Sequence, residues 1–224
     1  VEIIRSYGIE PIGAFILGLD TDTPESVDKL VNFVEKANIV AAQIYLLMGV
    51  QGTRTYKRLA TEDRIMAQPH KSPLLPTNLL YKIGQNEAFV QLRDAWRRIY
   101  EPRVFFARIR RNIATHKTGD APFSRVTSPH FNFRLASRLI WRLGLLPDYR
   151  FSFWKTCFLS IVSGRINLFM FWALYAYHLI KFRRVVMDKL PPVMPDETSY
   201  VTDFNKLPEG IDYARCGECT LLIY

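Results

Sequence analysis

The three cysteines of this 224-residue chain are its most obvious candidate metal ligands. Cys216 and Cys219 form one Cys-x-x-Cys pair near the C-terminus, and Cys157 stands alone. An iron–sulfur cluster with one open iron needs three thiolates that converge from one loop, and a structural zinc site needs four ligands. We therefore predict no metal ligand in this chain and interpret Cys216 and Cys219 as a reducible thiol pair. So few cysteines also indicate a reducing compartment.

Two carboxylates, Asp20 and Asp22, are the candidates for proton transfer, because they lie in a polar turn directly after an apolar run. Such residues can face a substrate, but they more often bond to their own turn and cap the next helix. The histidines are scattered along the chain at His70, His116, His130 and His178. We predict no catalytic residue in this chain.

Residues 9–47 predict a strand, a helix and a second strand. The runs 12–17 and 39–47 are apolar almost throughout, which is typical of strands buried on both faces. Between them, Thr23 and Pro24 predict the N-cap and first position of a helix. The apolar residues of this helix recur on one stripe: Val27, Leu30, Val31 and Val34.

This βαβ unit requires parallel strands and is not a domain by itself. Two parallel strands would leave edges and faces uncovered, so we expect the rest of the sheet to come from a partner or from sequence upstream. The remainder of the chain predicts helices. The expected fold class is α/β followed by mostly α.

The net charge of +9 is concentrated in residues 93–184, which carry 18 Lys and Arg against 4 Asp and Glu. Such asymmetry indicates an anionic partner and says nothing about the fold. No helix-turn-helix, zinc-finger or single-strand-binding signature accompanies it, so we disfavour nucleic acid and interpret pairs such as Arg110-Arg111 as solvated helix faces.

The segment 166–180 is strongly apolar and ends in Lys181. Fifteen helical residues span only about 22 Å, against roughly 30 Å of bilayer hydrocarbon. A buried core helix, or an interfacial helix with basic flanks on anionic lipid, therefore fits better than a membrane span. We hypothesise peripheral contact with an anionic membrane and a cytoplasmic location.

Two stretches carry a resemblance to a known family. Gly18-Leu-Asp-Thr-Asp-Thr-Pro24 follows the first apolar run, and the second run ends in Leu47-Met-Gly-Val-Gln-Gly52-Thr53. In order and spacing they resemble the fifth and sixth β/α units of radical-SAM enzymes. Residues 76–78 and the Arg-Ile-Tyr-Glu-Pro run at 98–102, with later aromatic motifs, resemble cobalamin-binding members that carry an uncharacterised helical domain after the barrel. Two features differ from the family pattern: position 51 is Gln instead of Pro, and the Cys-x-x-x-Cys-x-x-Cys cluster motif is absent.

The resemblance implies the last βαβ units of a partial TIM-type barrel plus a helical C-terminal extension. It implies S-adenosylmethionine (SAM) and a [4Fe–4S] cluster in the intact protein, with cobalamin as a further candidate and the cluster ligands outside this chain. Ile16 and Gly18 are then expected to contact adenine and ribose, with Leu47 packing on the adenine. Alternatively, Gly18 only permits a tight turn and the aliphatic residues are ordinary core.

On this basis the segments are residues 1–67, the C-terminal part of the barrel; 68–114, a loop and helices packed on it; 115–130, a linker; 131–186, a basic aromatic helical extension; and 187–224, an acidic extended tail. The expected function is a fragment of a radical-SAM enzyme, inactive alone. Its expected partners are the N-terminal half of that enzyme and a small-molecule or lipid-like substrate. The alternative is a non-catalytic basic helical module that binds a membrane surface or an anionic partner.

Overall fold

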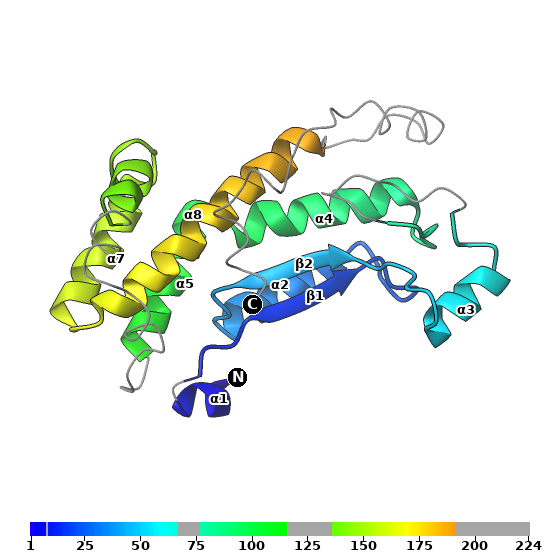
Figure 1. Cartoon of the computed structure of the whole chain (residues 1–224), viewed down its shortest axis with the longest axis horizontal. Coiled ribbons are helices and arrows are strands. Elements are labelled where there is room, and N and C mark those ends of the chain that lie inside the picture. Colours follow the sequence, from blue (N-terminus) through cyan, green and yellow to red (C-terminus); the bar gives the residue numbers. More distant parts are fainter. Residues whose placement is uncertain (8, 67–76, 116–135, 191–224) are drawn as a thin grey trace.

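The computed structural model describes residues 1–7, 9–66, 77–115 and 136–190. Figure 1 shows a small parallel sheet with its helices at one end and a group of packed helices at the other. In chain order the elements are α1 (Glu2–Ser6), β1 (Gly13–Leu17), α2 (Ser26–Lys36), β2 (Ala42–Leu46), α3 (Arg54–Thr61), α4 (Gln85–Ile99), α5 (Pro102–Thr115), the π-helical turn η2 (Ile140–Leu145), α7 (Arg150–Val162) and α8 (Ile166–Lys189).

The expected fold class is confirmed as a mixed α/β protein that is mostly helical. Its two strands are the only sheet in the described part of the chain, and they pair in parallel with Gly13 opposite Ala42 and Leu17 opposite Leu46. The barrel itself stays a prediction. Of the predicted linker the structure describes only Thr115, which ends α5, and of the predicted tail only residues 187–190, of which 187–189 belong to α8.

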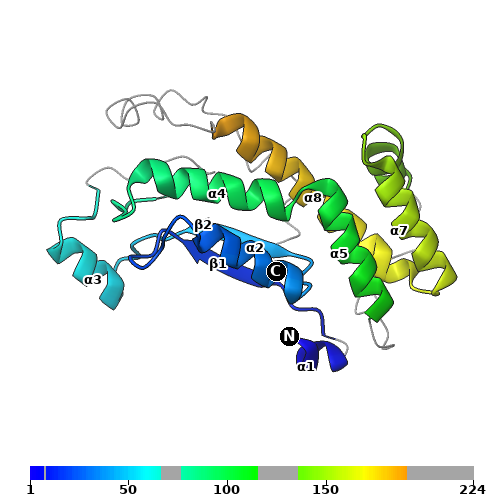
Figure 2. The same ribbon diagram turned by 180° about the vertical axis from the view of Figure 1, so that it is seen from behind.

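Burial of both strand faces was a wrong expectation. Burial alternates along β2, where Ala42 and Ile44 are buried while Gln43 and Tyr45 are exposed. On β1, the side chain of Ile16 is 52% exposed. Figures 1 and 2 show α2 on one face of the pair. Gln43 and Tyr45 are exposed on the other face, which we call the open face because no described helix covers it.

Helix α2 begins later than the sequence pattern predicts. Thr23 and Ser26 form a turn instead, in which the Ser26 N–H donates to the Thr23 carbonyl at 2.9 Å. The Thr23 N–H in turn donates to Ser26 Oγ at 3.0 Å, so the threonine does not cap the helix with its side chain. The predicted apolar stripe is confirmed, with Val27 and Val34 fully buried.

The helical half is built around α8, whose buried side chains include Leu168, Trp172, Ala176 and Ile180. Trp172 Nε1 donates to Asn112 Oδ1 of α5 at 2.9 Å, so even the polar atom of this ring is satisfied inside the protein. Of the two alternatives for residues 166–180, the structure therefore shows the core helix. Among the described residues, none of the helices is both long and apolar enough to cross a bilayer.

An ion pair between a buried arginine and a partly exposed glutamate joins the two halves of the molecule. The side chain of Arg108 on α5 is fully buried and donates to Glu35 Oε1 on α2 at 2.5 Å and to the Ile99 carbonyl at 2.6 Å. Arg111, also on α5, is half exposed and binds the other Glu35 oxygen. This pairing fixes the helical group against the βαβ unit.

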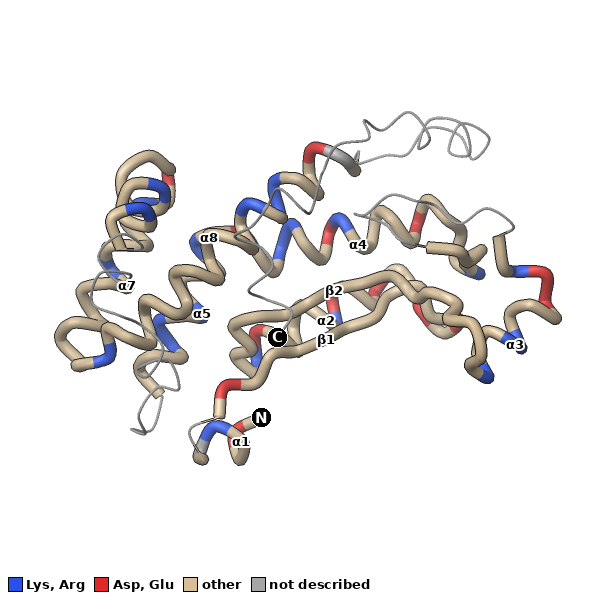
Figure 3. Tube along the Cα trace, in the orientation of Figure 1, with Lys and Arg blue, Asp and Glu red and all other residues tan. Residues whose placement is uncertain are grey.

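The charged residues of α5, α7 and α8 are mainly basic: Figure 3 shows more Lys and Arg than Asp and Glu on these three helices.

Candidate functional site

The residues that follow the two strands form one continuous rim. Gly18 follows β1 and Leu47 follows β2, and the Leu47 N–H donates to the Leu17 carbonyl at 2.7 Å. Tyr81, from the segment before α4, bridges them: its hydroxyl donates to the Leu47 carbonyl at 2.8 Å while its ring lies against Gly18. Ile16, the third predicted contact, lies on the open face of β1. The structure thus brings Gly18 and Leu47 to one edge of the sheet.

Gly18 is required by this packing. Its φ of +83° is in the left-handed region that side chains disfavour, and a Cβ at this position would lie 2.6 Å from the Tyr81 ring. Internal packing is therefore a sufficient reason for glycine here. The predicted contacts of Ile16, Gly18 and Leu47 with adenosine stay predictions.

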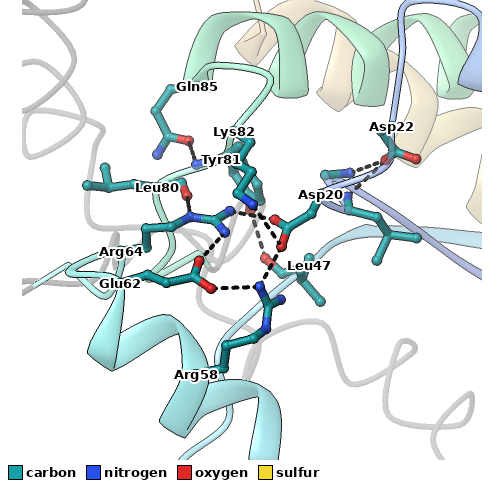
Figure 4. A network of polar contacts seen from close by, with 12 residues as sticks. Asp20, Asp22, Leu47, Arg58, Glu62, Arg64, Leu80, Tyr81, Lys82 and Gln85 are labelled. Atoms are coloured by element: carbon teal, nitrogen blue, oxygen red, sulfur yellow. Dashed lines mark hydrogen bonds and ion pairs between the residues drawn. The ribbon is translucent and has the colours of Figure 1, made fainter.

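Asp22 bonds to its own turn and does not have the role of facing a substrate, which was the other expectation for Asp20 and Asp22. Its Oδ2 accepts the N–H of Gly18 at 2.7 Å and the N–H of Leu19 at 2.9 Å. These bonds fix the backbone that follows β1 in the conformation shown in Figure 4. Asp22 is therefore a structural residue of the rim.

Asp20 lies in a cluster of cations (Figure 4). Its carboxylate is 2.7 Å from Arg58, 2.8 Å from Arg64 and 3.8 Å from Lys82. Hydrogen bonds from Arg64 and Arg58 lower the pKa of Asp20 from its ordinary value of 3.8 to about 2. The group therefore stays ionised at neutral pH and is poorly suited to proton transfer.

Tyr81 is equally unsuited to act as a base. Burial raises its pKa to about 12, while a hydrogen bond with Thr77 at 2.6 Å acts in the opposite direction. The phenol therefore stays protonated near neutral pH and serves as a donor to Leu47. The rim can hold a ligand through shape and backbone groups, but the groups described here supply no acid–base chemistry.

The sequence did not reveal the partners of Asp20 or the role of Tyr81. Arg58, Arg64 and Lys82 follow Asp20 by 38 to 62 residues and carry no spacing pattern that connects them to it. Tyr81 lies in a stretch that its prolines and glycine identify only as loop. The order of charged residues along the sequence does not indicate the ion pairs of Asp20, because they depend on the path of the chain after β2.

The outer edge of β2 is closed by two side chains of the α4 segment. The Tyr100 hydroxyl accepts the N–H of Ala42 at 2.7 Å and donates to the carbonyl of the same residue. Trp96 Nε1 donates to the Ile44 carbonyl at 3.3 Å. Both Ala42 and Tyr100 are fully buried. A further strand cannot pair along β2 at Ala42 and Ile44 while these side chains occupy the N–H and C=O of Ala42 and the C=O of Ile44.

The edge of β1 differs. Because the odd-numbered residues of β1 bond to β2, the N–H and C=O groups of Ala14 and Ile16 point away from it. No residue in the described ranges bonds to these four groups. The two edges of the sheet are thus unequal.

An iron–sulfur cluster does not fit the described residues. Cys157 on α7 is the single described cysteine, and burial raises the pKa of its thiol, which disfavours the thiolate that iron needs. The described ranges bring no three His, Cys, Asp or Glu side chains together as a metal site. Cys216 and Cys219 lie outside these ranges, so their interpretation as a thiol pair stays a prediction.

These features define a mixed α/β protein in which one βαβ unit with an open rim is fixed to a basic helical domain. The chain belongs to the family of the domain of unknown function DUF4070, whose model matches residues 53–191. The expected resemblance to cobalamin-binding radical-SAM proteins with a helical domain after the barrel is confirmed.

Two curated relatives extend this assignment. The chain is 29% identical over 189 residues to a hopanoid C-2 methylase of Rhodopseudomonas palustris (strain TIE-1), a match that covers 82% of this chain and 35% of the relative. It is 24% identical over 213 residues to an uncharacterized methyltransferase of Synechocystis sp. (strain ATCC 27184 / PCC 6803 / Kazusa), covering 89% of this chain and 38% of that protein. The chain thus spans little more than a third of the length of these relatives. No solved structure matches it significantly.

Proposed function

We propose that this chain is the C-terminal portion of a radical-SAM methylase, in which β1 and β2 are the last two strands of a partial barrel. The helical domain that follows then packs on the outside of this barrel. The names of both relatives, a methylase and a methyltransferase, support methyl transfer as the reaction. Cobalamin is the proposed methyl carrier, as in the family that the sequence resembles.

The observation that carries the proposal is that side chains close the β2 edge of the sheet, while no described residue bonds to the β1 edge. Tyr100 occupies both backbone groups of Ala42 and Trp96 occupies the carbonyl of Ile44, so β2 is suited to be a terminal strand. Ala14 and Ile16 of β1 present backbone groups that a preceding strand could pair with. A sheet that grows only from β1 requires strands earlier in the protein, as in a barrel whose final strand is β2.

The open face of the pair is the proposed inner wall of the barrel. Ile16, Gln43 and Tyr45 expose their side chains on it. Gly18 and Leu47 end the strands at the carboxyl edge, where barrel enzymes bind their ligands. We therefore keep Ile16, Gly18 and Leu47 as the proposed contacts to SAM.

The proposed part of this chain in the reaction is binding and positioning. When bound, SAM and the reduced cluster supply the radical chemistry, and the cluster ligands belong to another part of the enzyme. Asp22 holds the turn at Gly18, and Tyr81 fixes the carbonyl of Leu47, so the wall is rigid before a ligand arrives. Alone, the chain should be inactive.

The proposed substrate is a small or lipid-like molecule. The relative from Rhodopseudomonas palustris is named for a hopanoid, and the open face offers Ile16 and Tyr45 as apolar contact area. A cytoplasmic protein with peripheral membrane contact would reach such a substrate.

Anaerobic reconstitution tests the proposal. The 224-residue chain is incubated with iron, sulfide and SAM, and cluster content and 5′-deoxyadenosine are measured beside the longer protein that we propose contains it. We expect the longer protein to bind a cluster and to cleave SAM, and the isolated chain to do neither. Stoichiometric cluster and SAM cleavage by the isolated chain would show the proposal to be wrong.

A further inference from the structure

Helix α7 turns most of its large apolar side chains outward. Phe151 is 73% exposed, and Phe158 and Val162 are each 69% exposed. Trp154 and Ile161 are exposed too, and at 100° per residue the five side chains fall on one stripe of the helix. We call Phe151, Trp154, Phe158, Ile161 and Val162 the α7 face.

The opposite side of α7, which packs into the protein, combines the buried ring of Phe153 with two hydroxyl residues. Thr156 and Ser160 are fully buried there. Their hydroxyls donate to carbonyls within the same helix, at 2.7 Å to Ser152 and 2.6 Å to Thr156. A helix at a water surface normally keeps its large apolar residues inside and presents polar residues to the solvent, whereas the stripe defined above is exposed. The α7 face is therefore built to meet something less polar than water.

The preceding turn, η2, adds apolar surface and holds α7 in place. Trp141, Leu145 and Leu146 of this region are exposed. Trp154 Nε1 donates to the Gly144 carbonyl at 2.8 Å, and a Cβ on Gly144 would lie 2.9 Å from the Phe153 ring. The close contact makes η2 and α7 one rigid unit, so the apolar side chains are presented without a conformational change.

Positive charge surrounds this apolar surface. Residues 136–165 contain five Lys and Arg and a single acidic residue, Asp148. Lys155 is exposed within the stripe, and the Arg150 guanidinium lies 5.2 Å from the centroid of the Phe151 ring. In Figure 3 the basic residues are visible along this part of the chain. Aromatic and aliphatic side chains with basic neighbours match an anionic lipid surface, where apolar groups enter the acyl boundary and cations meet the headgroups.

We propose that the α7 face docks this protein onto a bilayer that contains anionic lipid. Phe151, Phe158, Ile161 and Val162 insert into the boundary between headgroups and acyl chains, and Arg150 and Lys155 bind the anionic headgroups. The contact lies on α7 and η2, whereas the sequence had indicated residues 166–180, which form the buried helix α8. The inference rests on α7 and η2 and does not depend on the proposed reaction.

Vesicle co-sedimentation tests it with the full chain. Vesicles of phosphatidylcholine with and without about a third phosphatidylglycerol are compared, and Val162→Glu is measured beside the matched control Val50→Glu. Val50 is 53% exposed and lies in the turn before α3. We expect binding to the anionic vesicles only, at least about tenfold weaker partitioning for Val162→Glu, and no change for Val50→Glu. Added salt should weaken the binding.

Brominated lipids report the location independently. Trp96 and Trp172 are buried, so quenching of tryptophan fluorescence by brominated acyl chains should come from Trp141 and Trp154 and should fall in Trp154→Phe. Binding that is equal on neutral vesicles, absent from all vesicles, or unchanged in Val162→Glu would overturn the inference. So would a dimer that Val162→Glu dissociates, because the α7 face would then bind a second copy. Thermal unfolding midpoints equal to that of the unchanged chain show that the variants are folded.

Discussion

Replacing Tyr100 by Phe removes the group that closes the outer edge of β2. The hydroxyl bonds to both the N–H and the C=O of Ala42, and both residues are fully buried. Burial raises the pKa of Tyr100, so the phenol stays protonated and can donate throughout the range in which the protein is studied. Tyr100→Phe therefore leaves one backbone donor and one backbone acceptor buried without a partner.

The expected loss of stability follows from these two backbone groups. Each buried polar group without a partner costs about 1–3 kcal/mol, and the loss of the hydroxyl's own burial cost offsets part of the sum. We expect the free energy of unfolding to fall by about 2–4 kcal/mol, which corresponds to roughly 4–16 °C in Tm for a chain of this size. Trp96 remains bonded to the Ile44 carbonyl, so the strand itself should persist.

Urea unfolding followed by circular dichroism measures this change. The control is Tyr45→Phe on the same strand, because Tyr45 is exposed and should lose less than about 0.5 kcal/mol. The midpoint should shift while the slope of the transition stays constant. A loss below about 0.5 kcal/mol for Tyr100→Phe would refute the view that its hydroxyl closes the edge.

Two further predictions concern the rim. Gly18→Ala should destabilise by at least about 3 kcal/mol because it adds a clash with Tyr81 to left-handed strain, whereas Gly52→Ala, with a similar φ of +85° and open space around it, should cost only about 1–2 kcal/mol; equal losses in urea unfolding would contradict this packing. The folded-state pKa of Asp20, about 2, lies below its ordinary 3.8, so the stability it contributes is present above about pH 4 and is lost as the pH falls toward 2. Asp20→Asn should therefore flatten the acid limb of a stability–pH curve between these values, and an unchanged limb would speak against the cation cluster.

The sequence predicted local units well because their signals are local. The stripe of Val27 and Val34 follows from spacing within a few residues. The expectation that both faces of the strands are buried was wrong for an equally local reason. Gln43 and the polar tip of Tyr45 alternate with buried Ile44, and this alternation is visible in the sequence of the second apolar run.

Contacts between distant segments could not be predicted in this way. Tyr100 and Trp96 reach β2 across more than 50 residues, although two polar-tipped aromatic rings on a buried helix face do indicate partners for those tips. The exposed apolar face of α7 could not be predicted from the sequence for another reason. Its apolar residues predict a helix, but only tertiary packing decides that Thr156 and Ser160 face inward and Phe158 faces outward.

Amide hydrogen exchange at the two sheet edges tests whether β1 pairs with a strand from an earlier part of the protein. The amides of Ala14, Ile16 and Ala42 are measured in this chain and in the longer protein that we propose contains it. We predict that the Ala14 and Ile16 amides exchange fast in the isolated chain and at least about tenfold slower in the longer protein, while Ala42 is slow in both. Ala14 and Ile16 amides that are already as slow as Ala42 in the isolated chain would contradict it.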